Sequence, residues 1–92
     1  MDITYDDNKS ARNVRERGLS FDRAREFDFT SALVAIDDRR PYGEVRYVAL
    51  GYLDKRLHVM CFTETQTGIR VISFRKANER EAKRNGKTLT ID

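Results

Sequence analysis

The chain has 92 residues, which suffices for one domain with a small core and excludes a second domain. Basic residues concentrate toward the C-terminus: residues 70–92 hold seven Lys/Arg against three Asp/Glu, whereas residues 1–38 hold six against nine. A basic end suits a polyanion such as RNA, but charge alone identifies neither a sequence preference nor a reaction.

The cysteine content and the hydropathy pattern indicate the cellular compartment in which the protein is expected. Cys61 is the only cysteine, which excludes an intramolecular disulfide, and we expect it to be an inert thiol packed in a strand. No apolar run approaches the ~20 residues needed to span a bilayer, and the polar N-terminus lacks the apolar centre of a signal peptide. We therefore expect a cytoplasmic protein.

The N-terminal part of the chain predicts a short strand followed by two helices. Asp2–Tyr5 suits a strand, and Asp6 or Asp7 then caps a helix that runs to about Arg17, with Gly18 in the left-handed position that ends it. A second, shorter helix follows, FDRAREF, with Ser20 as its cap. Its phenylalanines are expected to be core residues and not a platform for stacking bases.

The middle of the chain predicts a strand and a proline-containing loop. Ala32–Asp37 forms the strand, and the loop covers Asp38–Gly43. The pair Asp37-Asp38 suggests a metal ligand set, but no further Asp, His or Cys lies at ligand spacing nearby. We therefore expect a solvated turn.

Three strands and a helix complete the expected order. The strands form an antiparallel meander with loops of six and five residues, at Glu44–Leu50, Leu57–Thr63 and Ile69–Arg75. Asn78 is expected to cap a C-terminal helix that ends at Asn85-Gly86. The TLTI segment of the last residues, 87–92, suits pairing at a sheet edge, within the chain or in an oligomer.

Symmetric closure of both hairpins divides the side chains between two faces of the sheet. One face forms a mixed groove and carries Glu44, Arg46, Val48, Leu50, Leu57, Val59, Cys61, Thr63, Ile69, Val71, Ser73 and Arg75. The other is the core face and carries Val45, Tyr47, Ala49, Met60, Phe62, Ile72 and Phe74. A lone histidine suggests a general base, but this register puts His58, together with Arg70, at the margin of the core. A slip of one residue would exchange the faces.

Three blocks of sequence, taken together, resemble the BrnT family of bacterial toxins: YDDNKSARNVRERGLSFDRA, GEVRYVALG and TETQTGIRVISFRKANEREAKR. The most specific positions are Asp6, Lys9, Asn13, Gly18, Phe21, Glu44, Arg46, Gly51, Thr63, Glu64, Arg70, Ser73, Arg75 and Ala77. The chain departs from the family pattern at Tyr5, Phe74, Asn85 and the Glu16-Arg17 pair, where the family commonly has Trp, Ala, an aromatic residue and Lys-His. The missing histidine and aromatic argue against an acid or base role at those two places.

The resemblance implies a fold, an activity and partners. It implies a single α+β domain over residues 1–92 similar to RelE, in which an antiparallel meander packs against two N-terminal helices and a C-terminal helix follows. It also implies a ribonuclease that inhibits translation and growth and is neutralised by a BrnA-like antitoxin. That antitoxin is a ribbon-helix-helix protein that would link the complex to operator DNA, with a toxin dimer inside a heterotetramer as one arrangement.

The residues themselves suggest how RNA would be cut. RNA carries its own nucleophile, the 2′-OH, so cleavage needs a proton acceptor and cations around the phosphate, and no metal or cofactor. We expect Glu44 to be the base, Arg46 and Arg75 to clamp the phosphate, and Thr63 to donate a catalytic hydrogen bond. Further RNA contacts are expected from Ser73, Lys76, Arg80 and Arg70.

Two other interpretations stay open. Glu44 and Arg46 also suit a plain ion pair at a strand entrance, and the expected register separates Arg75 from Glu44 by ~20 Å, at ~3.3 Å per residue. The competing class is a non-catalytic module that binds RNA or a partner protein through the same face.

Overall fold

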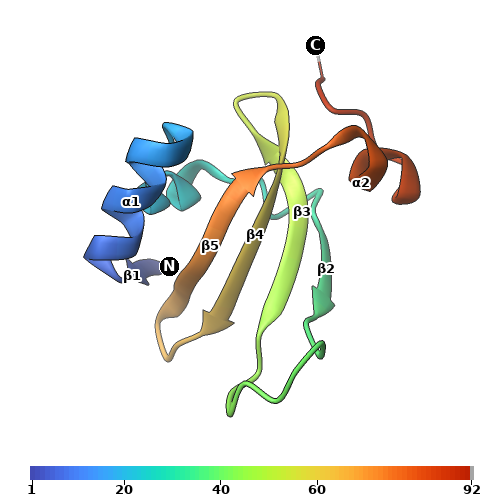
Figure 1. Cartoon of the computed structure of the whole chain (residues 1–92). Coiled ribbons are helices and arrows are strands. Elements are labelled where there is room, and N and C mark those ends of the chain that lie inside the picture. The colour runs from blue at the N-terminus through green and yellow to red at the C-terminus, as the bar shows by residue number, and fades with distance from the viewer. Residues whose placement is uncertain (92) are drawn as a thin grey trace.

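A five-stranded sheet organises the molecule, and the computed structural model describes residues 1–91 of it (Figure 1). The elements in chain order are β1 (Asp2–Tyr5), α1 (Asp7–Arg17), the 3₁₀ helix η1 (Phe21–Glu26), β2 (Leu33–Ile36), β3 (Tyr47–Leu53), β4 (Arg56–Glu64), β5 (Gly68–Lys76) and α2 (Glu79–Arg84). The strand order is β1-β5-β4-β3-β2. No helix within residues 1–91 is long and apolar enough to cross a membrane.

The helix boundaries follow the local signals in the sequence. Asp6 caps α1 by accepting a hydrogen bond from the Lys9 backbone N–H at 3.0 Å, and Gly18 ends it with a φ of 68°. Ser20 caps the next helix as expected, although that helix is a 3₁₀ helix. Asn78 caps α2 in a complete capping box. The expected caps of the three helices and the end of α1 at Gly18 are thus confirmed, whereas the second helix ends one residue before the expected Phe27.

The sheet is mixed, whereas the sequence predicted only an antiparallel meander. Strands β2 to β5 do form that meander, but β1 pairs in parallel with β5, with Asp2 opposite Gly68 and Tyr5 opposite Val71. The approach is close, because a Cβ added at Gly68 would lie 2.0 Å from the Asp2 carbonyl oxygen. Only glycine fits there, which explains how the N-terminal strand reaches the last strand.

The hairpin between β3 and β4 is tighter than expected. Its turn consists of Asp54 and Lys55, both with positive φ, at 51° and 62°. Such a turn matches the right-handed twist of the strands and needs no longer loop. The strands therefore extend to Leu53 and Arg56, and the predicted six-residue loop is wrong. The resulting register differs from the expected one by two positions, so the assignment of β3 and β4 side chains to faces is preserved.

A β-bulge changes the faces along β5. Cys61 lies opposite Ser73, but the next residue, Phe62, lies opposite Val71, so Ile72 is the extra residue. The predicted position of Ile69 and Val71 in the groove is therefore wrong, because both are buried in the core. The placement of Arg70 at the core margin is wrong for the same reason. The bulge brings Arg70 to the face that carries Ser73 and Arg75, called here the open face.

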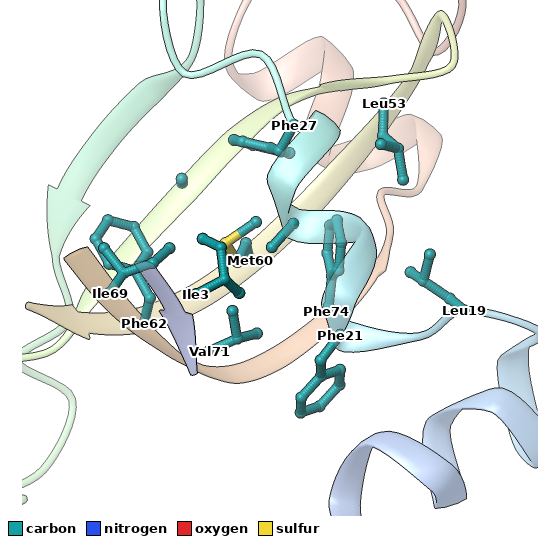
Figure 2. Packing of buried hydrophobic residues seen from close by; sticks show 12 residues of the cluster. Ile3, Leu19, Phe21, Phe27, Leu53, Met60, Phe62, Ile69, Val71 and Phe74 are labelled. Carbon is teal, nitrogen blue, oxygen red and sulfur yellow. The ribbon is translucent and has the colours of Figure 1, made fainter. Parts of the chain in front are cut away.

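The core face packs against η1 (Figure 2). The cluster consists of Ile3, Leu19, Phe21, Ala24, Phe27, Ala49, Leu53, Met60, Phe62, Ile69, Val71 and Phe74. Phe27 meets Phe74 edge-to-face with 6.0 Å between ring centroids. Val45, expected in this core, is exposed because it precedes β3, and Ile72 is half-buried at the bulge.

A second, smaller cluster closes one end of the open face. Leu50, Leu57 and Val59 pack there against α2 and the segment that follows it. The Leu57 N–H donates to the Leu89 carbonyl at 2.8 Å, and Thr90 forms a bridge with Arg56. The predicted pairing of the C-terminal segment thus occurs within the chain, at the start of β4. Asp92, part of that prediction, lies outside the described residues.

Candidate functional site

A carboxylate with two arginines, the Glu44 cluster, occupies one end of the open face. Arg46 Nε donates to Glu44 Oε2 at 3.0 Å, and Arg70 Nη2 donates to Oε1 and Oε2 at 3.0 and 3.1 Å. Glu44 and Arg46 lie just before β3, whereas Arg70 comes from β5 through the bulge. Segments far apart in sequence thus bring two guanidinium groups to one carboxylate, and the predicted Glu44–Arg46 pair gains a third member.

The neighbours of Glu44 set its protonation. The hydrogen bond from Arg46, together with the charge of Arg70, lowers the pKa of the Glu44 carboxyl below its usual value. Glu44 is therefore ionised and holds both arginines in place. While both donors occupy it, the carboxylate is a weaker base than a free glutamate.

Two further side chains fix the backbone and the arginine orientation in this cluster. Thr63 Oγ1 donates to the Val45 carbonyl at 2.8 Å, across from the segment that carries Glu44 and Arg46. The Arg46 guanidinium lies over the Tyr42 ring, 4.2 Å from its centroid. The Thr63 hydroxyl hydrogen is therefore engaged with the backbone, and Thr63 positions the cluster in this state.

A second ion pair, the Arg75 cluster, lies farther along β5 on the same face. Arg75 makes a fork-like double hydrogen bond to Glu81, from Nη1 to Oε1 at 2.9 Å and from Nη2 to Oε2 at 2.7 Å. Glu81 also accepts the Asn78 backbone N–H in the capping box of α2. The bonds from Arg75 lower the pKa of Glu81 to about 2, and they raise the pKa of Arg75. The start of α2 thus orients the strongest candidate phosphate clamp.

The loop between β2 and β3 connects the two clusters. Asp37, with a side chain only 2% exposed, accepts hydrogen bonds from Arg39 Nε and Nη2, both at 2.7 Å, and from Tyr42 Oη at 3.0 Å. These bonds, from Arg39 first, keep the pKa of Asp37 far below its usual range. The expected solvated turn is thus wrong for Asp37, whose carboxylate is buried in an ion pair with the exposed Arg39. The 72% exposed Arg39 side chain was not predicted as a site residue, although an arginine two residues after an aspartate was a usable signal.

Two hollows share this loop. One, of about 440 Å³, lies between the loop and the Arg75 cluster and is lined by Asp37, Arg39, Cys61, Ser73, Arg75 and Glu81, among others. The other, of about 590 Å³, is formed by residues 36–46, which include Glu44 and Arg46. Because Asp37 and Arg39 line both, the open face carries a continuous row of arginines from Arg75 to the Glu44 cluster.

The remaining residues predicted to contact RNA do not all lie on the open face. Ser73 is exposed on the open face, opposite the half-buried thiol of Cys61. Arg80 is exposed on α2. Lys76 does not share that face, because it follows Arg75 directly in β5 and lines a different hollow, beside His58. The structure therefore brings most but not all of the predicted residues to one surface.

His58 lies at the core margin, as predicted. Its side chain packs beside Phe74, with 5.5 Å between ring centroids, and the residue is 4% exposed. Nδ1 lies 2.8 Å from the Arg56 carbonyl oxygen, so a proton on Nδ1 satisfies that bond. Burial lowers the pKa of the imidazole. Within residues 1–91, no group of three or more His, Cys, Asp and Glu side chains is arranged to hold a metal ion.

Comparison with known proteins identifies the class of protein. Residues 5–81 match a family model described as the ribonuclease toxin, BrnT, of type II toxin-antitoxin systems, which covers both arginine clusters. The class is thus that of ribonuclease toxins that act with an antitoxin partner. The chain belongs to the BrnT family. No curated protein matches it.

Proposed function

We propose that the chain is a metal-independent endoribonuclease toxin whose RNA strand lies along the open face, between the Arg75 cluster and the Glu44 cluster. The observation that carries this proposal is the row of arginines at positions 75, 39, 46 and 70, each held by a carboxylate and each partly exposed. Guanidinium groups held in a fixed orientation suit phosphate, because their forked donors match its oxygens.

The chemistry follows from an exchange of partners at Glu44. When a phosphate accepts the hydrogen bonds of Arg46 and Arg70, Glu44 loses its donors, and its pKa rises toward the ordinary value. Glu44 then takes the proton of the 2′-OH, the 2′-oxygen bonds to phosphorus, and the bond to the 5′-oxygen breaks. The leaving oxygen takes a proton from solvent. The products are a 2′,3′-cyclic phosphate and a 5′-hydroxyl, and the two arginines stabilise the charge of the transition state.

The roles of the other residues follow from their positions. Thr63 holds the segment of Glu44 through its bond to the Val45 carbonyl, and so supports the catalytic geometry. Arg75 clamps a neighbouring phosphate, with Ser73 and Arg80 as further contacts along the strand. Because the Arg75 and Glu44 clusters are separate, we assign Arg75 to binding and the Glu44 cluster to bond cleavage.

Chelation and product analysis test this chemistry. Purified protein incubated with RNA in excess EDTA is expected to cut, and mass spectrometry is expected to find 2′,3′-cyclic phosphate or 3′-phosphate ends. Glu44→Gln, which keeps the shape but cannot accept the proton, should stop cleavage and still bind RNA. Loss of cutting in EDTA with recovery on adding magnesium or manganese would contradict the mechanism. Full RNA binding with no cutting by the unmodified chain would favour the non-catalytic module instead.

The toxin role also implies a neutralising partner, which we propose is a BrnA-like ribbon-helix-helix protein acting in the same cytoplasm. The edge strand β2 offers a surface for it, because Leu33, Val34 and Ile36 are exposed there and Ile36 is 64% exposed. An edge strand with unpaired backbone groups accepts an added strand or an apolar segment readily.

Growth experiments test the partner. Expression of the chain alone is expected to arrest bacterial growth, and co-expression of the neighbouring gene is expected to restore it. Val34→Lys on the edge strand should abolish rescue without abolishing arrest, whereas Arg12→Lys on α1 serves as a control that leaves both unchanged. Normal growth despite soluble expression would count against the toxin role.

A further inference from the structure

A hollow on the core side of the sheet gathers basic side chains that the proposed reaction does not use. It measures about 660 Å³, and its polar lining consists of Arg17, Arg23, Asp54, Arg56, His58 and Lys76. We call it the hairpin hollow, because the β3–β4 turn forms one wall. Four cations thus share one hollow with a single carboxylate, Asp54, and that carboxylate is bound by Arg23 at 2.7 Å.

The other cations of the hollow have few partners. Within residues 1–91, the side chains of Arg17 and Lys76 make no hydrogen bond or ion pair, and both are exposed. Arg56 Nη2 donates to the Ala77 carbonyl at 2.7 Å, but its buried Nε has no acceptor among the described residues. Three positive groups, from α1, β4 and β5, therefore face one space without a carboxylate to neutralise them. The three cations repel one another, and a bound anion would relieve that repulsion.

The floor of the hollow is formed by His58, a neutral side chain that can lie beside a bound anion. His58 uses Nδ1 for the Arg56 carbonyl, which leaves Nε2 as its second polar atom. Burial lowers the pKa of the imidazole, and the charges of Arg56 and Lys76 act in the same direction, whereas the hydrogen bond to the Arg56 carbonyl and the charge of Asp54 oppose them. A bound phosphate would reverse the balance and favour a proton on Nε2.

The end of β5 connects this hollow to the open face. Strand β1 pairs only with residues 68–71, so beyond them this edge of β5, the one opposite β4, has no strand beside it. Asn13 of α1 donates to the Phe74 carbonyl there at 2.9 Å. Beyond that point, Arg75 faces the open face and Lys76 faces the hollow, because successive side chains of a strand alternate. Figure 1 shows the end of β5 and the β3–β4 turn at the same end of the sheet. A strand of RNA held at Arg75 can therefore turn around this edge.

We propose that the hairpin hollow binds a backbone phosphate of the RNA strand that leaves the Arg75 cluster, with Arg17, Arg56 and Lys76 as its cations. The proposal rests on the proposed RNA substrate and adds a second binding surface on the opposite side of the sheet. The extra contact would fix which phosphate of a bound strand reaches Glu44.

Binding of an uncleavable RNA tests the proposal. The probe is a single-stranded 2′-O-methyl oligonucleotide, which lacks the attacking hydroxyl, and affinity is measured by fluorescence anisotropy over a series of salt concentrations. Each phosphate contact on a single strand contributes roughly −0.7 to the slope of log affinity against log salt. We expect the double variant Arg17→Gln/Lys76→Gln to bind about tenfold more weakly and to flatten the slope by about one contact. The double variant Arg15→Gln/Lys83→Gln removes the same charge outside the hollow and is the control.

The single histidine of the chain gives a second, local measurement. The NMR signals of the His58 ring should shift when the oligonucleotide is added to the unmodified chain and to the control, and should not shift with Arg17→Gln/Lys76→Gln. Equal slopes for the two double variants together with an unmoved His58 signal would overturn the proposal. If that happened while Arg75→Gln still weakened binding, the open-face site would stand. If the His58 signal shifted but the unmodified chain never cut RNA, the hollow would stand and the nuclease mechanism would fail.

Discussion

The arginines of the open face and the cations of the hairpin hollow illustrate two ways to handle positive charge. On the open face, Arg39, Arg46, Arg70 and Arg75 each have a carboxylate partner within 3.0 Å. In the hairpin hollow, four cations face one carboxylate. Paired arginines are held in a fixed geometry, which suits catalysis, whereas unpaired cations give a stronger field, which suits capture of a charged strand. The comparison predicts that the Glu44 cluster of the open face governs the cleavage rate, whereas the hollow, together with Arg75, governs the affinity for RNA.

The largest expected effect is on cleavage by Arg70→Gln. This change removes a guanidinium placed to stabilise the transition state, and loss of one such donor lowers the rate by about 10²- to 10³-fold. Cleavage of a labelled RNA under single-turnover conditions measures it, and Arg15→Gln on α1 is the matched control. A rate within twofold of the control would remove Arg70 and its carboxylate from the catalytic mechanism.

The next effect concerns the fixed geometry that Glu81 gives to Arg75, as distinct from the charge of Arg75 alone. Glu81→Gln deprives Arg75 of its forked acceptor and should destabilise the fold by about 1.5 to 3 kcal/mol at neutral pH, the range for hydrogen bonds to charged groups. The carboxyl pKa is lowered from 4.5 to about 2 on folding, so its stabilisation is complete above pH 4.5 and is lost as the pH falls toward 2. Urea denaturation at several acidic pH values should show a steeper loss of stability in the unmodified chain than in the variant, because Asp37 and Glu44 titrate in both proteins. Parallel curves for the two proteins would contradict it.

The smallest effect concerns the neutral histidine of the hollow. Burial lowers the pKa of His58 in the folded state, so the unfolded chain takes up the proton first as the pH falls below 6.5. The stabilisation is therefore complete above pH 6.5 and declines below it, by at most about 1.4 kcal/mol per pH unit. Unfolding free energies of the chain and of His58→Asn between pH 7.5 and 5.5 measure the difference. A difference that does not change with pH would mean that His58 is not held neutral.

Local signals explain the parts of the fold that the sequence predicted well. The caps Asp6, Ser20 and Asn78 each satisfy nearby backbone N–H groups, so their effect is readable within four residues of chain. The strands of the meander were equally recognisable from their β-branched and aromatic content. The boundaries of β3 were not, because Gly51 suggested an end and the Asp54-Lys55 turn lacks the asparagine-glycine pair typical of its type.

The sequence predicted which residues supply the chemistry of the candidate site, but not which of them lie next to one another. Arginines at positions 46, 70 and 75 carried the expected chemistry, but their partners depend on one extra residue in β5, and alternation alone gives no warning of a bulge. The ion pair of Asp37 with Arg39 was missed because burial of a loop carboxylate is decided by Tyr42 and the neighbouring strands. The hairpin hollow joins α1, β4 and β5, which no local pattern brings together.

The parallel pairing of β1 with β5 has a consequence for the time at which the molecule becomes active. Residues 2–5 are made well before their pairing partners at 68–71. Contacts between such distant segments form late, because the intervening chain must be ordered first. Arg70 and Arg75 belong to this later strand, so a nascent chain that ends before β5 has neither a closed sheet nor these two open-face arginines. A cell that makes this toxin is therefore exposed to it only after β5 has been made and paired, and an antitoxin already present can bind the toxin as soon as it folds.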